Sequence, residues 1–167
     1  VDNLEIIPNE ESDFSSWRGQ HDYRLWFAKP DRVIDVVTAK AAMGIKIGGL
    51  HDFERVRIQA GIANAPFEWN ARFTPLDVKG HSGIVEQKGC YPGQEVIERT
   101  IAIGRPARRL VKVQGAAIVA DQKILNESAQ AIGFLTSTIQ ATPSSRVGLA
   151  VIKSKLELTE TYCTDQE

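Results

Sequence analysis

The chain contains little cysteine and no long apolar run. Its 167 residues include two cysteines, Cys90 and Cys163, far from the dense, even spacing of a disulfide-linked scaffold and suited to a reducing compartment. No apolar run approaches the roughly 18 residues that a membrane span requires. The acidic start has neither the basic leader nor the apolar core of a signal peptide. We therefore expect a cytoplasmic protein that does not enter membranes.

An excess of charge of one sign is also absent. The chain carries 20 basic and 21 acidic side chains, so it offers no bulk attraction for nucleic acid or an anionic membrane. Its three histidines, His21, His51 and His81, have no HxxxH or CxxC partner, and we expect no structural metal site. With 43% hydrophobic residues, the composition is that of one globular domain or two small ones.

Helix signals lie in the first two thirds of the chain. Asp31 is a candidate helix cap before apolar residues at helical spacing, and Gly44 stands where a left-handed helix end is needed. From Leu50 to Ala60 apolar residues recur every three or four positions, and Gly61 ends this amphipathic helix. We also predict an irregular or edge segment over 1–20, strands over 23–28 and 45–47, strands and loops over 62–87, and one or two helical turns over 93–100.

Beyond residue 104 the pattern changes to short β-type runs. They are LVKV, AAIVA, AIGFLTSTIQ and RVGLAVIKSKLEL, separated by turn residues. Such spacing is typical of a small antiparallel barrel or sandwich. We therefore predict an α+β fold with one domain over residues 1–104 and a second over 105–167.

The segment KGCYPGQE, from Lys88 to Glu95, holds the residue of greatest chemical interest. A thiol reacts or binds metal as the thiolate, and both a neighbouring ammonium and the start of a helix favour that charged form. Cys90 is therefore the first candidate for a reactive residue, with Lys88 assisting it. The alternative is that Cys90 is a small buried hydrophobe, as many lone cysteines are.

Several segments resemble one family in their order and spacing. They are GGLHDFERVRIQAG (48–61), TPLD (74–77), KGCYPGQE (88–95), GRPARRL (104–110), IGFLTSTIQATP (132–143) and VGLAVIK (147–153). Together they resemble the YgfZ branch of the folate-binding superfamily that also contains the glycine-cleavage T-protein, an aminomethyltransferase. The cysteine in KGCYPGQE is the mark of the YgfZ branch.

The resemblance implies a fold and a function. Residues 1–104 would be the C-terminal portion of the folate-binding, T-protein-like domain, and 105–167 a small antiparallel β-barrel, so the chain would begin midway through the family's fold. The implied function is a folate-binding accessory protein for iron-sulfur cluster assembly or maintenance, supporting iron-sulfur enzymes such as those of tRNA modification. Its implied cofactor is tetrahydrofolate, and its implied partners are iron-sulfur proteins or assembly factors.

The resemblance also implies the site residues. Cys90 and Lys88 would carry the chemistry, and the folate would be bound by Gln59, Asp77, Tyr91, Gln94 and Glu95. At the position of Gln59 the T-protein pattern has a glutamate, and glutamine offers one acceptor and a donor in place of two acceptors.

Four alternatives remain open. Glu95 can cap the local helix rather than reach a folate, and Asp77 can simply end a strand. A rival function is a tetrahydrofolate-dependent aminomethyltransferase. A basic cluster can meet RNA or an acidic partner, although no aromatic stacking pattern accompanies it, which argues against direct nucleic-acid binding. The cluster comprises Arg99, Arg105, Arg108, Arg109 and Lys112.

Overall fold

The computed structural model describes residues 17–18, 22–23, 29–85, 89–126, 128–155 and 163–164. The chain divides into two compact units, Val1–Val56 and Arg57–Glu167. In the part of the chain that the structure describes, no helix is long and apolar enough to cross a membrane.

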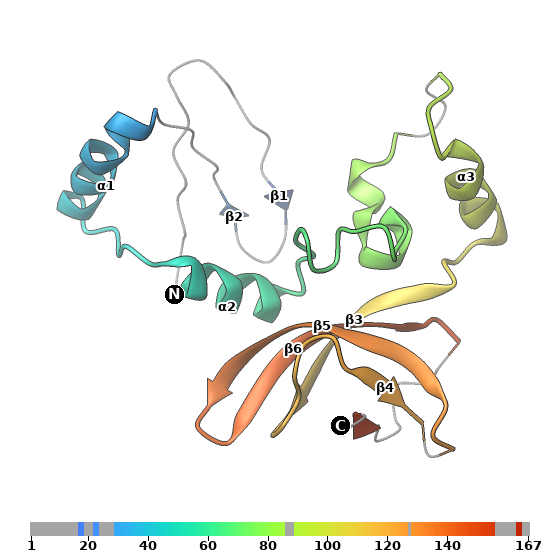
Figure 1. The fold of residues 1–167 in the computed structure, drawn as a ribbon. Coiled ribbons are helices and arrows are strands. Elements are labelled where there is room, and N and C mark those ends of the chain that lie inside the picture. The colour runs from blue at the N-terminus through green and yellow to red at the C-terminus, as the bar shows by residue number, and fades with distance from the viewer. Residues whose placement is uncertain are drawn as a thin grey trace. The chain divides into compact units, whose positions relative to one another are not determined.

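The first unit contains a two-stranded ladder and helical segments. Strand β1 (Trp17–Arg18) pairs antiparallel with β2 (Asp22–Tyr23). A 3-10 turn, η1 (Pro30–Arg32), leads into helix α1 (Val33–Ala42), and helix α2 (Leu50–Ala60) begins in this unit (Figure 1).

The ends of α1 show which local predictions were right. Gly44 adopts a left-handed conformation after the helix, at φ 82°, as predicted. Asp31 was expected to cap α1, but it lies within η1. The N-cap residue of α1 is Arg32. The predicted strand over 45–47 is wrong, because these residues form no regular secondary structure.

The second unit is built on an antiparallel sheet. Its strands are β3 (Arg108–Gly115), β4 (Lys123–Leu125), β5 (Ala131–Thr142), β6 (Ser145–Lys153) and β7 (Cys163–Thr164). Their spatial order is β3-β6-β5-β4-β7, and β5 and β6 form the long central hairpin (Figure 1). Before the sheet come two 3-10 turns, η2 (Pro75–Val78) and η3 (Gly80–Gly83), and helix α3 (Gln94–Ile103).

The α+β class and the antiparallel sheet agree with the prediction, but the expected barrel is not closed. Closure requires the first and last strands in the spatial order to pair. In the described residues β7 pairs only with β4, and β3 only with β6. The run AAIVA, predicted as a strand, forms bends and turns between β3 and β4. The boundary near residue 104 stays a prediction; Gly104 ends α3 in a left-handed conformation.

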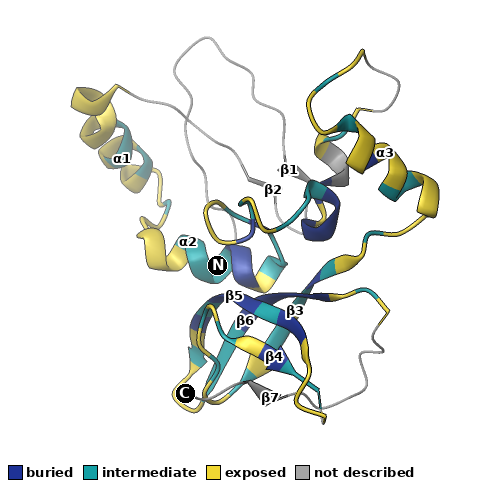
Figure 2. Ribbon diagram, turned by 45° about the vertical axis from the view of Figure 1, so that its right-hand side comes forward, coloured by how far each residue is buried: buried dark blue, intermediate teal, exposed yellow. Residues whose placement is uncertain are grey.

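The sheet has apolar contacts on both faces. From Gly148 to Ile152 every residue of β6 is buried, and successive side chains of a strand point to opposite faces. Leu149 and Val151 pack in one cluster, with Ile58 and Val78 from the segment before the sheet, and Ala150 and Ile152 pack in the other. Figure 2 shows these buried stretches in dark blue. Ile58, Ala63 and Val78 thereby hold the segment before the sheet against one of its faces.

Candidate functional site

Cys90 lies exposed in the turn that precedes α3. It is a free cysteine, so the structure does not support the alternative of a buried structural thiol. The turn becomes a helix at Gly93, which adopts φ 86°, a left-handed conformation that glycine reaches without strain. Lys88, the expected partner of the thiol, lies outside the described residues.

A cavity of about 600 Å³ opens beside this turn. Three stretches of chain contribute to its lining: the segment before and within η2, the η3 region, and the turn with the first residues of α3. The lining residues are Trp69, Phe73, Thr74, Pro75, Gly80, Gly83, Ile84, Val85, Tyr91, Pro92, Gly93, Val96 and Ile97. Cys90 directly precedes the lining segment 91–93.

The lining is aromatic and apolar. Trp69, Phe73 and Tyr91 supply three aromatic rings, and among the described lining residues no side chain carries a charge. Thr74 contributes a hydroxyl, but that oxygen already accepts a hydrogen bond from the backbone N–H of Asp77 at 3.3 Å. A cavity of this size and lining suits a flat aromatic group, since ligand pockets of about 300–1,000 Å³ are mostly apolar with few polar groups.

The predicted folate residues do not all meet at this cavity. Tyr91 lines it, and Gln94 follows the lining residue Gly93, with its side-chain amide donating to Glu98. Glu95 is exposed in the first turn of α3, where a negative charge is favourable to the helix dipole. Gln59 is exposed on α2 and is not among the lining residues.

Asp77 is buried and holds backbone rather than lining the cavity. One carboxylate oxygen accepts from the N–H of Thr74 at 2.9 Å and the other from the N–H of Arg108 at 3.2 Å. The first bond completes a capping box at η2, because the Thr74 hydroxyl accepts from the Asp77 N–H in return. The second ties η2 to the start of β3.

A buried ion pair in the second unit has no counterpart in the sequence predictions. Arg57 and Glu68 are 1% and 0% exposed, and Nη1 of Arg57 donates to Oε2 of Glu68 at 3.1 Å. The same carboxylate oxygen accepts from the N–H of Asn64 at 3.0 Å. Buried charges are costly unless they are paired and hydrogen-bonded, and the contacts of Arg57 and Glu68 meet both conditions.

Two hydroxyls of β5 complete this network. Thr136 Oγ1 donates to Oε1 of Glu68 at 2.5 Å, and the Ser137 hydroxyl donates to the same oxygen while it accepts from Nη2 of Arg57. Neighbouring residues of a regular strand point to opposite faces. The pairing of β5 with β6 shifts between Leu135 and Ser137, and such a bulge re-aims side chains. This bulge explains how both hydroxyls reach one carboxylate.

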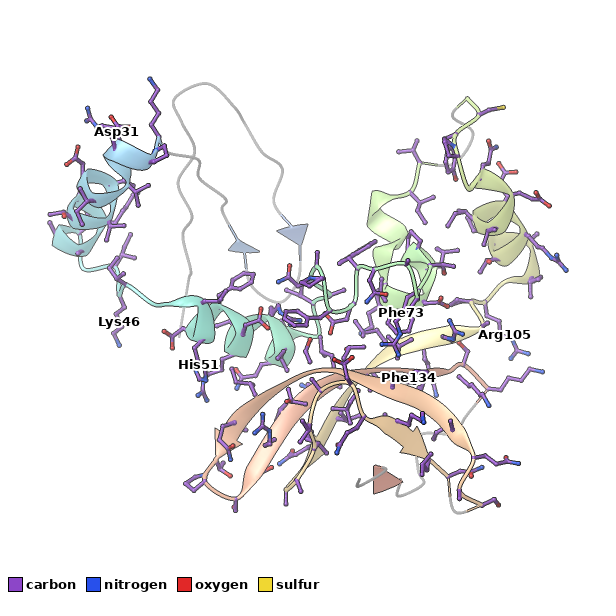
Figure 3. The ribbon with its side chains drawn as sticks, viewed as in Figure 1. Asp31, Lys46, His51, Phe73, Arg105 and Phe134 are labelled. Atoms are coloured by element: carbon purple, nitrogen blue, oxygen red, sulfur yellow. The ribbon has the colours of Figure 1, made fainter. Side chains whose placement is uncertain are left out.

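The basic cluster is partly engaged in packing. Arg108 Nη1 donates to the carbonyl of Arg72 at 3.1 Å, and Lys112 Nζ donates to the carbonyl of Gln59 at 3.2 Å. The guanidinium of Arg72 lies 4.5 Å from the Phe134 ring centre and 5.6 Å from that of Phe73. Figure 3 labels both residues, Phe73 in the segment before η2 and Phe134 on β5. At least two of the five cations therefore help to hold the unit together.

Comparison with known proteins gives no independent assignment: no protein-family model matches the chain, and no curated protein matches it. The structure describes no group of three or more His, Cys, Asp and Glu side chains that is placed to hold a metal ion.

Proposed function

We propose that the chain is a YgfZ-like, folate-binding accessory protein, which works in the cytoplasm in the assembly or maintenance of iron-sulfur clusters. Its clients would be iron-sulfur enzymes, such as those of tRNA modification. The observation that carries this proposal is the position of Cys90. The cysteine of the KGCYPGQE motif is exposed and directly precedes a segment that lines an aromatic cavity.

The volume and aromatic lining of the cavity support tetrahydrofolate as its proposed ligand. Trp69, Phe73 and Tyr91 offer surfaces on which a flat ring stacks. No described lining residue is acidic, so the aminopyrimidine edge of the ring would pair with backbone groups or with the Tyr91 hydroxyl. When bound, tetrahydrofolate would supply a one-carbon carrier or a redox-active ring beside Cys90.

Cys90 would act together with a partner protein. Iron-sulfur clusters are generally held by four protein ligands, and one exposed thiol supplies at most one of them. The exposed Cys90, next to the lining segment 91–93, would complete or transiently contact a cluster whose other ligands belong to the client. The role of the chain is therefore that of a binding and assembly factor rather than of a self-sufficient catalyst.

The proposal is tested in cells that depend on the gene of this chain. Replacing Cys90 by alanine should lower the activity of iron-sulfur enzymes and the thiolation of tRNA while the protein level is unchanged. Activity and thiolation equal to those of the wild type would refute the role of Cys90.

A second assay separates this function from that of an aminomethyltransferase. The purified chain should be stabilised against heat by 5-formyltetrahydrofolate, because a ligand that binds only the folded state raises its stability. It should form no methylenetetrahydrofolate from tetrahydrofolate and an aminomethyl-lipoyl donor. Turnover of that donor would replace the proposal by the transferase function.

A further inference from the structure

Gly80 is the one lining glycine at which a side chain has no room. A Cβ atom placed on Gly80 would lie 2.5 Å from Cη2 of Trp69 and 2.8 Å from the carbonyl oxygen of Pro75. Gly83 also lines the cavity, but a Cβ atom there meets nothing within 4 Å. Gly80 does not adopt a positive φ, so the restriction at this position comes from its neighbours and not from its backbone conformation.

The carbonyl neighbour of Gly80 is fixed. The Pro75 carbonyl accepts the backbone N–H of Lys79 at the end of η2, and the capping box between Thr74 and Asp77 holds the start of the same turn. A new side chain at position 80 therefore cannot be relieved by moving Pro75 without breaking η2. A shift of the Trp69 indole relieves the 2.5 Å contact, whereas the 2.8 Å contact with the Pro75 carbonyl remains as strain at η2.

The direction in which the indole moves follows from its other contacts. The backbone of Trp69 is held at its base, because its N–H donates to the carbonyl of Asn64 at 3.3 Å and its neighbour Glu68 is part of the buried ion pair. Trp69 also packs against the core cluster that contains Ile58 and Val78. The core is close-packed, so the ring has space only on the side of the cavity that it lines.

We propose that Gly80 determines the size and ligand preference of the cavity. Because glycine has no side chain, the Trp69 ring can lie against the backbone of residue 80 and leave the cavity open. Ordinary carbon contacts are about 3.5–4.0 Å long, so a methyl group at position 80 displaces the ring by about 1 Å. The cavity then narrows in the direction in which a flat aromatic ligand would stack on Trp69. This inference rests on the proposed binding of a folate ring at the same cavity.

The test compares Gly80→Ala with the matched control Gly83→Ala. In a chain with Trp17 and Trp26 replaced by phenylalanine, Trp69 is the sole tryptophan. Gly80→Ala should shift its fluorescence emission and its quenching by acrylamide, whereas Gly83→Ala should leave both unchanged. Equal spectra for the two variants would overturn the inference whether or not any ligand binds.

Ligand titration supplies the functional readout. With natural tryptophans, Gly80→Ala should bind 5-formyltetrahydrofolate roughly tenfold more weakly than the wild type, since about one methylene in an apolar pocket has an effect of that order. Gly83→Ala should bind like the wild type. Absence of binding by the wild type refutes the folate proposal alone, whereas equal binding by wild type and Gly80→Ala refutes the role of Gly80.

A rescue variant guards against a general loss of folding. Phenylalanine at position 69 lacks the indole atom that Gly80→Ala meets, so Gly80→Ala combined with Trp69→Phe should regain the part of the thermal stability that is lost against Trp69, while the strain against the Pro75 carbonyl stays in both variants. If the double variant is destabilised by the full sum of the two single changes, the methyl group at position 80 does not displace the Trp69 ring, and the inference fails.

Discussion

Replacement of Glu68 by glutamine should destabilise the second unit strongly. Glutamine keeps the shape of the side chain but turns one oxygen into a donor. In the folded chain Oε2 accepts from Arg57 and Asn64, and Oε1 accepts from two hydroxyls. Whichever way the amide is turned, at least one buried donor loses its acceptor, and the guanidinium of Arg57 loses its counter-charge.

The expected loss follows from the burial of the pair. Both side chains are almost completely inaccessible, at 1% and 0% exposure. Breaking such a pair by removing one partner destabilises a protein by about 3–5 kcal/mol, a large part of the roughly 5–15 kcal/mol that holds a typical domain folded. The exposed pair between Arg72 and Asp121, 3.5 Å apart, serves as the control. Asp121→Asn should change stability by less than about 1 kcal/mol, because such surface pairs contribute little and asparagine tolerates the left-handed backbone found there.

The assay is urea unfolding followed by circular dichroism and tryptophan fluorescence. The slope of the unfolding free energy against urea concentration is compared between variants, to confirm that unfolding exposes the same amount of surface in each. A double-mutant cycle with Arg57→Met adds the specific test. If the ion pair is the cause, Glu68→Gln should cost less in the Arg57→Met background than in the wild type. A loss below about 1 kcal/mol for Glu68→Gln, or strict additivity in the cycle, would refute the reasoning.

Two further predictions concern residues of the sequence motifs. Asp77→Ala should destabilise the protein by about 1 kcal/mol or more in urea unfolding, since it removes the Asp77 half of the capping box at η2 and the acceptor of the Arg108 N–H; a stability equal to that of the wild type would show that these bonds do not contribute. Cys90→Ser should change stability by less than about 0.5 kcal/mol, as exposed positions do, and mass spectrometry should show Cys90 alkylated by iodoacetamide in the native state; a thiol that reacts only in urea would contradict its exposure.

Local signals in the sequence predicted several elements correctly. Apolar spacing indicated α2, and Gly61 and Gly44 end their helices at φ 71° and 82° because glycine reaches the left-handed region without strain. β5 and β6 were visible as β-type runs. These features depend on residues that are neighbours in the sequence, and for that reason periodicity and turn chemistry suffice.

The rest depended on contacts between distant residues. AAIVA has the composition of a strand, yet its neighbours give it no pairing partner, and it forms bends and turns. Glu68 meets Thr136 and Ser137 across about 70 positions, through a bulge that no local pattern indicates. The motif marked Cys90 as a candidate, but the cavity beside it is formed by three separate stretches of chain.

The most direct test of the proposed function is protection of Cys90 by folate. In a Cys163→Ser background Cys90 is the sole cysteine, and its alkylation by iodoacetamide is followed with and without saturating 5-formyltetrahydrofolate. If the ligand occupies the cavity that Tyr91 lines, alkylation of Cys90 should slow, and Gly80→Ala should require roughly tenfold more ligand for the same protection. An alkylation rate that does not change at any ligand concentration would contradict a folate site beside Cys90.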